Sequence, residues 1–177
     1  VLNYPIAERA TTFKIGYVPQ YGGYFHDLTL LQNLKAIAEI QIIDNSIRLN
    51  TIEKIISQFE FNSIINIPAK FLSGGQKKKL VIALSLLNSP RVLLLDEPFA
   101  ALDVLTIKML KELIVNLQSQ EKISICICDH QARDLLSCVD NAIILSNCKI
   151  IAKGTPTQLV NDIKAKNAYF GDSFKYN

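Results

Sequence analysis

The segment LSGGQKKKLVIALSLLNSPRVLLLDEP, residues 72–98, decides what the rest of the sequence must build. After Leu72 it reads Ser-Gly-Gly, continues for the length of one helix, and ends in an apolar run followed by two carboxylates and a proline. Ser73 and Gln76 have the spacing of a capping box, in which each side chain binds the backbone N–H of the other residue. We therefore expect a helix capped by Ser73 and a strand that ends at Asp96.

Gly74 and Gly75 leave the first N–H groups of this helix uncovered, and such a helix start favours an anion. The alternative is that Ser73 only starts the helix. Glycine in a helix costs up to roughly 1 kcal/mol relative to alanine, and residues 77–79, all lysine, add positive charge at the positive helix end. A sequence that accepts both penalties favours phosphate binding. The lysine run itself is expected to form a solvated helix face.

The apolar run at residues 92–95 is typical of a buried parallel strand. Asp96 and Glu97 follow it, and Pro98 stops the strand. In an α/β nucleotide hydrolase the first acid can hold Mg²⁺, and the second can take a proton from the attacking water. Taken alone, such a pair could be two solvated carboxylates in a turn. This pair lies one helix after LSGGQ, which favours a role in nucleotide chemistry instead.

The remaining patterns predict an α/β fold with a mainly parallel sheet. Residues 13–18 alternate like a strand that ends at Pro19, and Gln20 follows. Residues 27–89 show only helix and loop patterns, so we expect an inserted helical subdomain there, with a core built from residues 1–26 and 90–177. Further strands and helices are expected at 104–117, 123–128, 131–137, 142–145 and 149–152, with capping boxes at 29–32 and 155–158.

Composition limits the possible functions. The chain has 177 residues, 49% hydrophobic and 20% charged, which is enough for a folded domain. A net charge of +3 without a basic face argues against nucleic acid as a partner. No apolar run approaches the roughly 20 residues that a membrane span needs. Cys126, Cys128, Cys138 and Cys148 lack paired zinc spacing, so we expect buried, reduced thiols.

In this order the motifs resemble those of the ABC ATPases. Residues 72–76 match the signature motif, 91–98 the Walker B motif and 17–20 the Q-loop. Residues 101–103 match the D-loop, and His130 matches the switch histidine. The resemblance covers nearly the whole chain and implies a P-loop NTPase-like domain that uses ATP and Mg²⁺.

The family assigns roles to the matching positions. Glu97 would polarise the attacking water, Asp96 and Gln20 would organise Mg²⁺, and His130 would sense the γ-phosphate. Asp103 would belong to a loop that crosses the dimer interface, although an ordinary helix N-cap is an equal alternative.

The resemblance also implies a homodimer that encloses two ATP molecules. In such a dimer Ser73, Gly74, Gly75 and Gln76 would act on the nucleotide held by the partner copy. The signature and the acidic pair would therefore serve different nucleotides.

Within the family the chain is most similar to the ATPases of bacterial lipopolysaccharide export. The segments that carry this likeness are 15–20, 27–33, 96–103, 154–159 and 168–174. The likeness implies transmembrane permease partners and a cytoplasmic place on the inner face of the inner membrane. Phe25 would lie in the groove that receives the permease helices, with core packing as the alternative. Leu84, Ala101 and Val104 replace the usual arginine, glycine and proline.

One family motif is absent, because no GxxxxGK[ST] occurs in the sequence. We expect this Walker A loop to precede Val1, so that the chain is a fragment that cannot hold ATP alone. A branched-chain amino-acid importer ATPase and a non-catalytic truncated remnant remain alternatives. A soluble ABC protein of DNA repair or translation would need a second cassette, zinc cysteines or a long insertion between Gln20 and Leu72.

Overall fold

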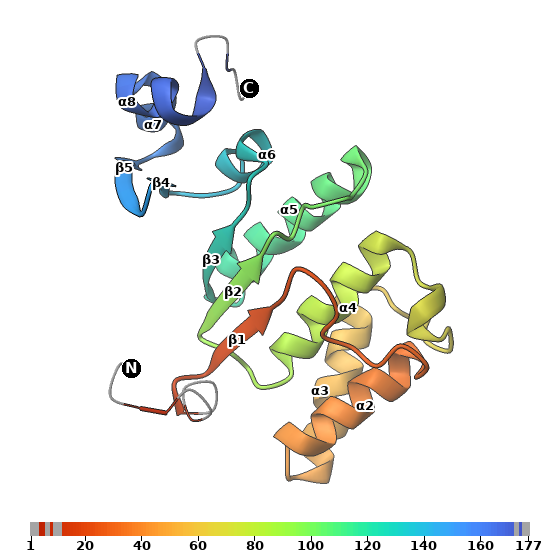
Figure 1. Cartoon of the computed structure of the whole chain (residues 1–177). Helices are drawn as coiled ribbons and strands as arrows, with labels where there is room; N and C mark the ends of the chain where they lie inside the picture. Colours follow the sequence, from red (N-terminus) through yellow and green to blue (C-terminus); the bar gives the residue numbers. More distant parts are fainter. Residues whose placement is uncertain (1–3, 6–7, 9–11, 172–173, 175–177) are drawn as a thin grey trace. The chain divides into compact units, whose positions relative to one another are not determined.

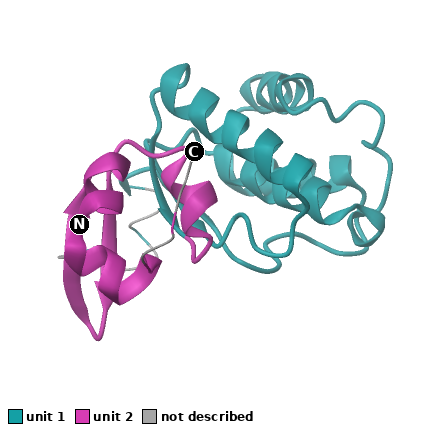
Figure 2. Cartoon of the chain, turned by 90° about the horizontal axis from the view of Figure 1, so that it is seen from above, with its two compact units in different colours: residues 1–128 teal, residues 129–177 magenta. Residues whose placement is uncertain are grey.

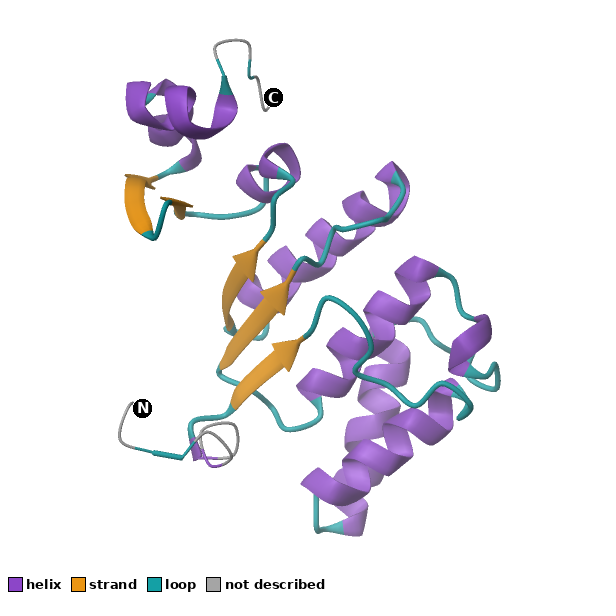
Figure 3. Ribbon diagram, viewed as in Figure 1, coloured by secondary structure: helices purple, strands orange, loops and turns teal. Residues whose placement is uncertain are grey.

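The computed structural model describes residues 4–5, 8, 12–171 and 174 of the chain (Figure 1). The chain divides into two compact units, Val1–Cys128 and Asp129–Asn177 (Figure 2). The first unit contains a parallel sheet and the long helices, and the second a β-hairpin with short helices (Figure 3).

The first unit carries the elements expected around residues 72–98. In chain order these are β1 (Ile15–Val18), α2 (Leu30–Gln41), α3 (Asn45–Gln58), the 3₁₀ turn η1 (Ala69–Phe71), α4 (Gly74–Leu86), β2 (Val92–Asp96), α5 (Val104–Ser119) and β3 (Ser124–Cys128). The strands form a parallel sheet in the order β1-β2-β3, with Val18 opposite Leu95 and Asp96 opposite Cys128. The predicted α/β class with a parallel sheet is confirmed.

The two faces of this sheet differ. Side chains alternate along a strand, and α4 packs against β1 while α5 packs against β3. Val18, Leu93 and Leu95 are accordingly buried, whereas Tyr17 is 56% exposed and Leu94 37% exposed. The prediction of a continuously buried strand at residues 92–95 is therefore wrong for Leu94, because the helices of this unit cover one face of the sheet.

The same alternation corrects the expectation for the cysteines. Cys126 and Cys128 share a face of β3, as their spacing requires, but they are exposed. Cys148 is also exposed, and Cys138 is intermediate. All four are free thiols, and the prediction that they are buried is wrong.

The helices between β1 and β2 form one packed group, in which α2 contacts both α3 and α4. The predicted capping box of Thr29 and Gln32 is confirmed at the start of α2. Residues 27–89 lie in the same compact unit as the sheet. Their division from the core as a helical subdomain stays a prediction.

The second unit packs around a small apolar cluster of its own. Its elements are α6 (Ala132–Leu136), β4 (Ala142–Ser146), β5 (Lys149–Gly154), α7 (Pro156–Asn161), α8 (Ile163–Ala165) and the π-helix η2 (Lys166–Phe170). The predicted strand pair β4–β5 is antiparallel, and the predicted capping box of Thr155 and Gln158 starts α7. The cluster contains Leu136, Ile144, Ala152, Leu159 and Ala165.

Candidate nucleotide site

The carboxyl ends of β1 and β2 bring together two of the predicted site residues. The Gln20 side chain follows β1, and its Nε2 donates a hydrogen bond to Oε2 of Glu97 at 2.6 Å. Glu97 comes directly after β2, one residue beyond Asp96. Side chains at this edge of a parallel sheet are in the usual position for a ligand.

The backbone at Glu97 turns sharply. Its φ of 42° lies in the left-handed region, which is unfavourable for a residue with a side chain by roughly 1–2 kcal/mol. Its N–H donates to the carbonyl oxygen of Cys128 at 2.8 Å, which ties the turn to the end of β3. Strained backbone of this kind is common where a side chain must be aimed at a ligand.

Tyr17 opens the segment that matches the Q-loop, but the contact of its side chain was not predicted. Its hydroxyl donates to Oδ2 of Asp96 at 3.1 Å, and this hydrogen bond to the carboxylate raises the pKa of Tyr17. The strand register contained the signal: Tyr17 lies opposite Leu94, and Asp96 is two residues further along β2 on the same face.

The Asp96 carboxylate and the Gln20 amide carry oxygen atoms of the type that binds Mg²⁺. The ion prefers carboxylate and carbonyl oxygens and usually keeps several waters. Asp96 supplies a carboxylate directly at the strand end, and Gln20 supplies an amide whose nitrogen is the atom facing Glu97. Their chemistry therefore fits the predicted metal role of Asp96 and Gln20.

The start of α4 has the predicted capping box. The Ser73 hydroxyl accepts from the Gln76 N–H at 3.2 Å, and the Gln76 side chain accepts from the Ser73 N–H at 2.9 Å. Packing against neighbouring residues also explains why Gly74 and Gly75 lack side chains. A Cβ on Gly75 would overlap the Thr106 methyl group of α5, and one on Gly74 would meet Leu102 at 3.3 Å. The bare helix start is thus held tightly against the beginning of α5.

Lys78 links this helix to the loop of Gln20. Its side chain is buried, and its Nζ donates to the carbonyl oxygens of Gln20 at 3.1 Å and of Pro19 at 3.4 Å. The expectation of a solvated lysine face is therefore wrong for Lys78. Its spacing from the buried Val81 and Ile82, three and four residues on, was the signal in the sequence.

Asp103 is the N-cap of α5, which was one of its two expected roles. Its carboxylate accepts from the Thr106 N–H at 3.0 Å and from the Thr106 hydroxyl at 2.6 Å. Both hydrogen bonds lower the pKa of Asp103, and the one from the Thr106 hydroxyl has the larger effect. Ala101 has a φ of 57°, a conformation that glycine adopts without strain.

The Gln20 loop, the first turns of α4 and the turn before α5 enclose a pocket of about 190 Å³. Its walls come from three segments that are far apart in the sequence. The lining residues are Pro19, Gln20, Tyr21, Gly22, Tyr24, Gly74, Lys77, Lys78, Val81, Ala100, Ala101 and Leu102. The helix start and the Gln20 loop therefore border one hollow.

His130 belongs to the second unit and comes two residues after the end of β3. Its side chain is 66% exposed, and its Nδ1 lies 4.0 Å from Oδ1 of Asp129, whose side chain is fully buried. The same Asp129 oxygen accepts the Gln131 N–H at 2.8 Å. The buried Asp129 carboxylate thus stabilises the turn around His130, while the imidazole is exposed to solvent.

Phe25 is about half exposed and has an anchored backbone. The side-chain oxygen of the buried Asn33 of α2 accepts the Phe25 N–H at 2.7 Å. The two hydrogens of its amide nitrogen are shared among the carbonyl oxygens of Phe25, Leu28 and Thr29, which lie 3.0, 3.1 and 3.0 Å away. The sequence analysis missed Asn33, although it lies three residues after Leu30 on the buried stripe of α2. The Phe25 ring is therefore presented by a rigid loop.

A parallel sheet with an acidic pair after its middle strand and an LSGGQ helix start define an ABC-type ATPase. The chain belongs to the ABC transporter family, whose model matches residues 3–100. It is 36% identical over 172 residues to the lipopolysaccharide export system ATP-binding protein LptB of Haemophilus influenzae, which covers 97% of this chain and 70% of that protein. The protein of the same name from Acidithiobacillus ferridurans is 32% identical over 171 residues, with the same coverage.

Solved structures share the fold. The cbiO1 protein of Clostridium perfringens, part of the ABC transporter complex cbiONQ, has a TM-score of 0.79 at 25% identity, over 88% of this chain and 62% of that chain. A dimeric ATP-binding cassette bound to ADP and Pi has a TM-score of 0.73 at 21% identity, over 87% of this chain and 68% of its own. The predicted ABC fold is confirmed, and the chain spans about two thirds of these structures.

Proposed function

We propose that this chain is the ATP-hydrolysing subunit of a transporter that exports lipopolysaccharide. The hydrogen bond between Gln20 and Glu97 carries the proposal, because it joins the predicted metal-organising amide to the predicted base at one strand edge. The likeness to two lipopolysaccharide export ATP-binding proteins supports the cargo. Among the residues that the structure describes, no helix has the length and apolar character needed to cross a membrane. We propose a cytoplasmic place on the inner face of the inner membrane.

In the proposed reaction Glu97 orients a water molecule or takes its proton. The water oxygen bonds to the γ-phosphorus, the bond from that phosphorus to the β–γ bridging oxygen breaks, and ADP leaves. Asp96 and Gln20 would hold Mg²⁺, which would neutralise charge on the phosphate oxygens. Tyr17 fixes one oxygen of Asp96. His130 contacts the γ-phosphate.

The helix start acts on a second nucleotide. In the proposed homodimer the capped N-terminus at residues 73–76 directs its N–H groups at the ATP of the partner copy. Gly75 allows this start to lie against Thr106, so the α5 start sets its position. We propose that Asp103, which caps α5, lies at the dimer interface.

The 177 residues contain no GxxxxGK[ST] segment to hold the phosphates. We therefore expect the chain alone to show no ATP binding at micromolar concentration in isothermal titration calorimetry. A fusion that places such a segment from a relative before Val1, called the extended protein below, should bind MgATP and hydrolyse it. Tight binding by the chain alone would contradict this expectation. An extended protein that folds but does not turn over would favour a non-catalytic role.

The proposed permease contact predicts a selective effect at Phe25. Phe25→Ala in the extended protein should weaken co-purification with the permease subunits about tenfold or more, as loss of a buried aromatic anchor does. Its ATPase rate without permease should not change. Ile163→Ala, which also truncates an exposed apolar side chain, is the matched control and should bind normally.

The identity of the permease decides the cargo. Recovery of the lipopolysaccharide export permease pair would support the proposal. Recovery of a branched-chain amino-acid permease pair instead would contradict it. If the Phe25→Ala variant bound the permease subunits as well as the unchanged protein does, the proposed docking role of Phe25 would be wrong.

A further inference from the structure

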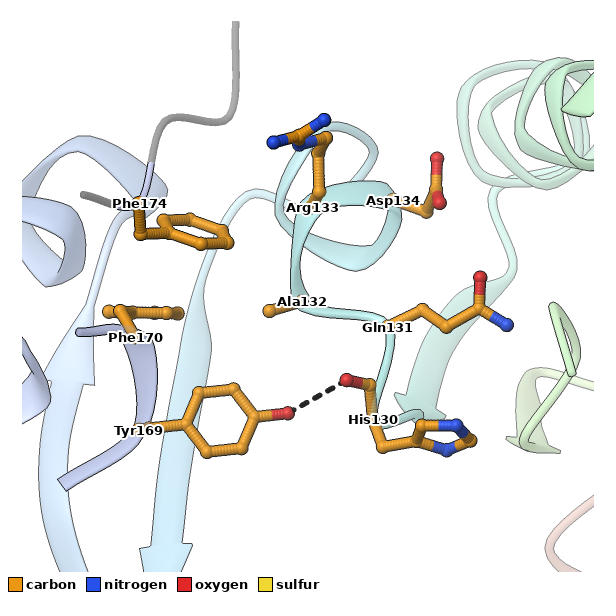
Figure 4. A pocket seen from close by; sticks show the side chains of 8 residues that line it. All are labelled: His130, Gln131, Ala132, Arg133, Asp134, Tyr169, Phe170 and Phe174. Carbon is orange, nitrogen blue, oxygen red and sulfur yellow. Dashed lines mark hydrogen bonds between the residues drawn. The ribbon is translucent and has the colours of Figure 1, made fainter.

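The turn of His130 borders an aromatic surface within the second unit. A pocket of about 490 Å³ lies between residues 130–134 on one side and Tyr169, Phe170 and Phe174 on the other (Figure 4). Residues 168–174 carry part of the likeness to the export ATPases and have no role in the proposed function. Within that segment Asp172 and Ser173 lie outside the described residues.

A hydrogen bond crosses between the two sides. The Tyr169 hydroxyl donates to the carbonyl oxygen of His130 at 3.0 Å, as the dashed line in Figure 4 shows. The same oxygen accepts the Ala132 N–H at 3.0 Å. A carbonyl oxygen has two lone pairs, so these donors use its full capacity. Burial, with the Asp129 carboxylate, raises the pKa of Tyr169.

The Tyr169 ring is itself held in place. It packs edge-on against Phe170 with ring centroids 5.4 Å apart, and Phe170 stacks on Phe174 at 4.6 Å. Phe170 and Phe174 pack against the apolar cluster of this unit. Tyr169 thus connects the His130 turn to the core of the second unit.

Tyr169 and Phe170 end a π-helix, η2. Its widened turn closes with the Gly171 N–H on the carbonyl oxygen of Lys166 at 2.8 Å. Helical turns of this type are rare and are found frequently at functional sites. Gly171 then has a φ of 74°, which lets the chain turn away directly after Phe170.

We propose that Tyr169 is a positioning residue, which fixes the peptide of His130 and thereby the direction in which the His130 side chain leaves the backbone. The proposal rests on the proposed function only for the consequence in hydrolysis, since the contact itself needs no nucleotide. Asp129 holds the turn through the Gln131 N–H, and Tyr169 holds it through the His130 carbonyl. With both peptides fixed, less backbone freedom is lost when the imidazole meets a phosphate.

Nuclear magnetic resonance of the 177-residue chain tests the contact directly, because the sequence contains two histidines, His26 and His130. In Tyr169→Phe the imidazole Cε1–H signal of His130 should shift, and its relaxation should report larger ring motion on the picosecond-to-nanosecond timescale. The His26 signal should not change. Tyr4→Phe, which removes a tyrosine hydroxyl from the other unit, should leave both signals unchanged.

An unchanged His130 signal in Tyr169→Phe would overturn the proposal, and so would equal changes at His26 and His130, which would indicate a general perturbation. In the extended protein Tyr169→Phe should lower kcat roughly threefold to tenfold, the effect of one lost hydrogen bond, with KM for ATP retained. If the unchanged extended protein does not hydrolyse ATP, the proposed function fails. The resonance measurement would still decide the role of Tyr169 toward His130.

Discussion

Glu97→Gln in the extended protein is expected to lower the ATP hydrolysis rate by roughly 10²–10⁴-fold, the usual contribution of a positioned general base. The amide keeps the size of the carboxylate but cannot accept a proton. It can still pair with Gln20, because its carbonyl oxygen can accept the hydrogen bond that Oε2 accepts now. ATP affinity should therefore stay within about threefold of the unchanged protein, since loss of a transition-state interaction alone does not weaken ground-state binding.

Measuring phosphate release and equilibrium ATP binding on the same variant separates the loss of hydrolysis from any change in ATP affinity. Glu112→Gln is the matched control, because Glu112 is an exposed carboxylate on α5 outside the site. The control should hydrolyse ATP at the normal rate. Hydrolysis retained by Glu97→Gln would remove Glu97 from the role of base.

Gly75→Ala is expected to destabilise the 177-residue chain by about 1–3 kcal/mol, the usual cost of overpacking. The added methyl group would overlap the Thr106 methyl group, and Thr106 cannot turn freely because its hydroxyl donates to Asp103. Alanine gains up to about 1 kcal/mol of helix propensity over glycine, so the overlap has to outweigh this gain. Thermal unfolding followed by circular dichroism should show the lowered Tm.

Two further variants separate packing from propensity. Gly74→Ala makes the same change one position earlier, where the new methyl group would meet Leu102 at 3.3 Å, and should cost far less. Thr106→Ser removes the overlapping methyl group and keeps the hydroxyl. The double variant Gly75→Ala/Thr106→Ser should recover most of the lost stability. A double variant as unstable as Gly75→Ala would show that Thr106 is not the obstacle.

Local signals in the sequence were sufficient for much of the fold. The capping boxes at Ser73 and Thr155 depend on side chains three residues apart, so the sequence predicts the starts of α4 and α7 correctly. The two-residue turn between β4 and β5 is equally local. Residue order alone also placed Glu97 after a strand and one helix beyond LSGGQ.

The contacts that were missed depend on packing between distant segments. Lys78 is buried because the Gln20 loop covers it, and Tyr17 meets Asp96 because β1 and β2 pair in one register. Tyr169 reaches His130 through a π-helix that apolar spacing does not signal. Cys126 and Cys128 are exposed because the helices cover the opposite face of β3, and strand composition does not say which face is covered.

In the proposed homodimer the two ends of residues 72–98 serve different nucleotides. Mixing two inactive variants of the extended protein, Ser73→Arg and Glu97→Gln, tests it most directly. If the signature acts on the partner's ATP, mixed dimers contain one intact site, and random pairing should restore roughly a quarter of the normal hydrolysis rate. If both ends served the same nucleotide, every site would carry one defect, and the mixture would remain as inactive as its components.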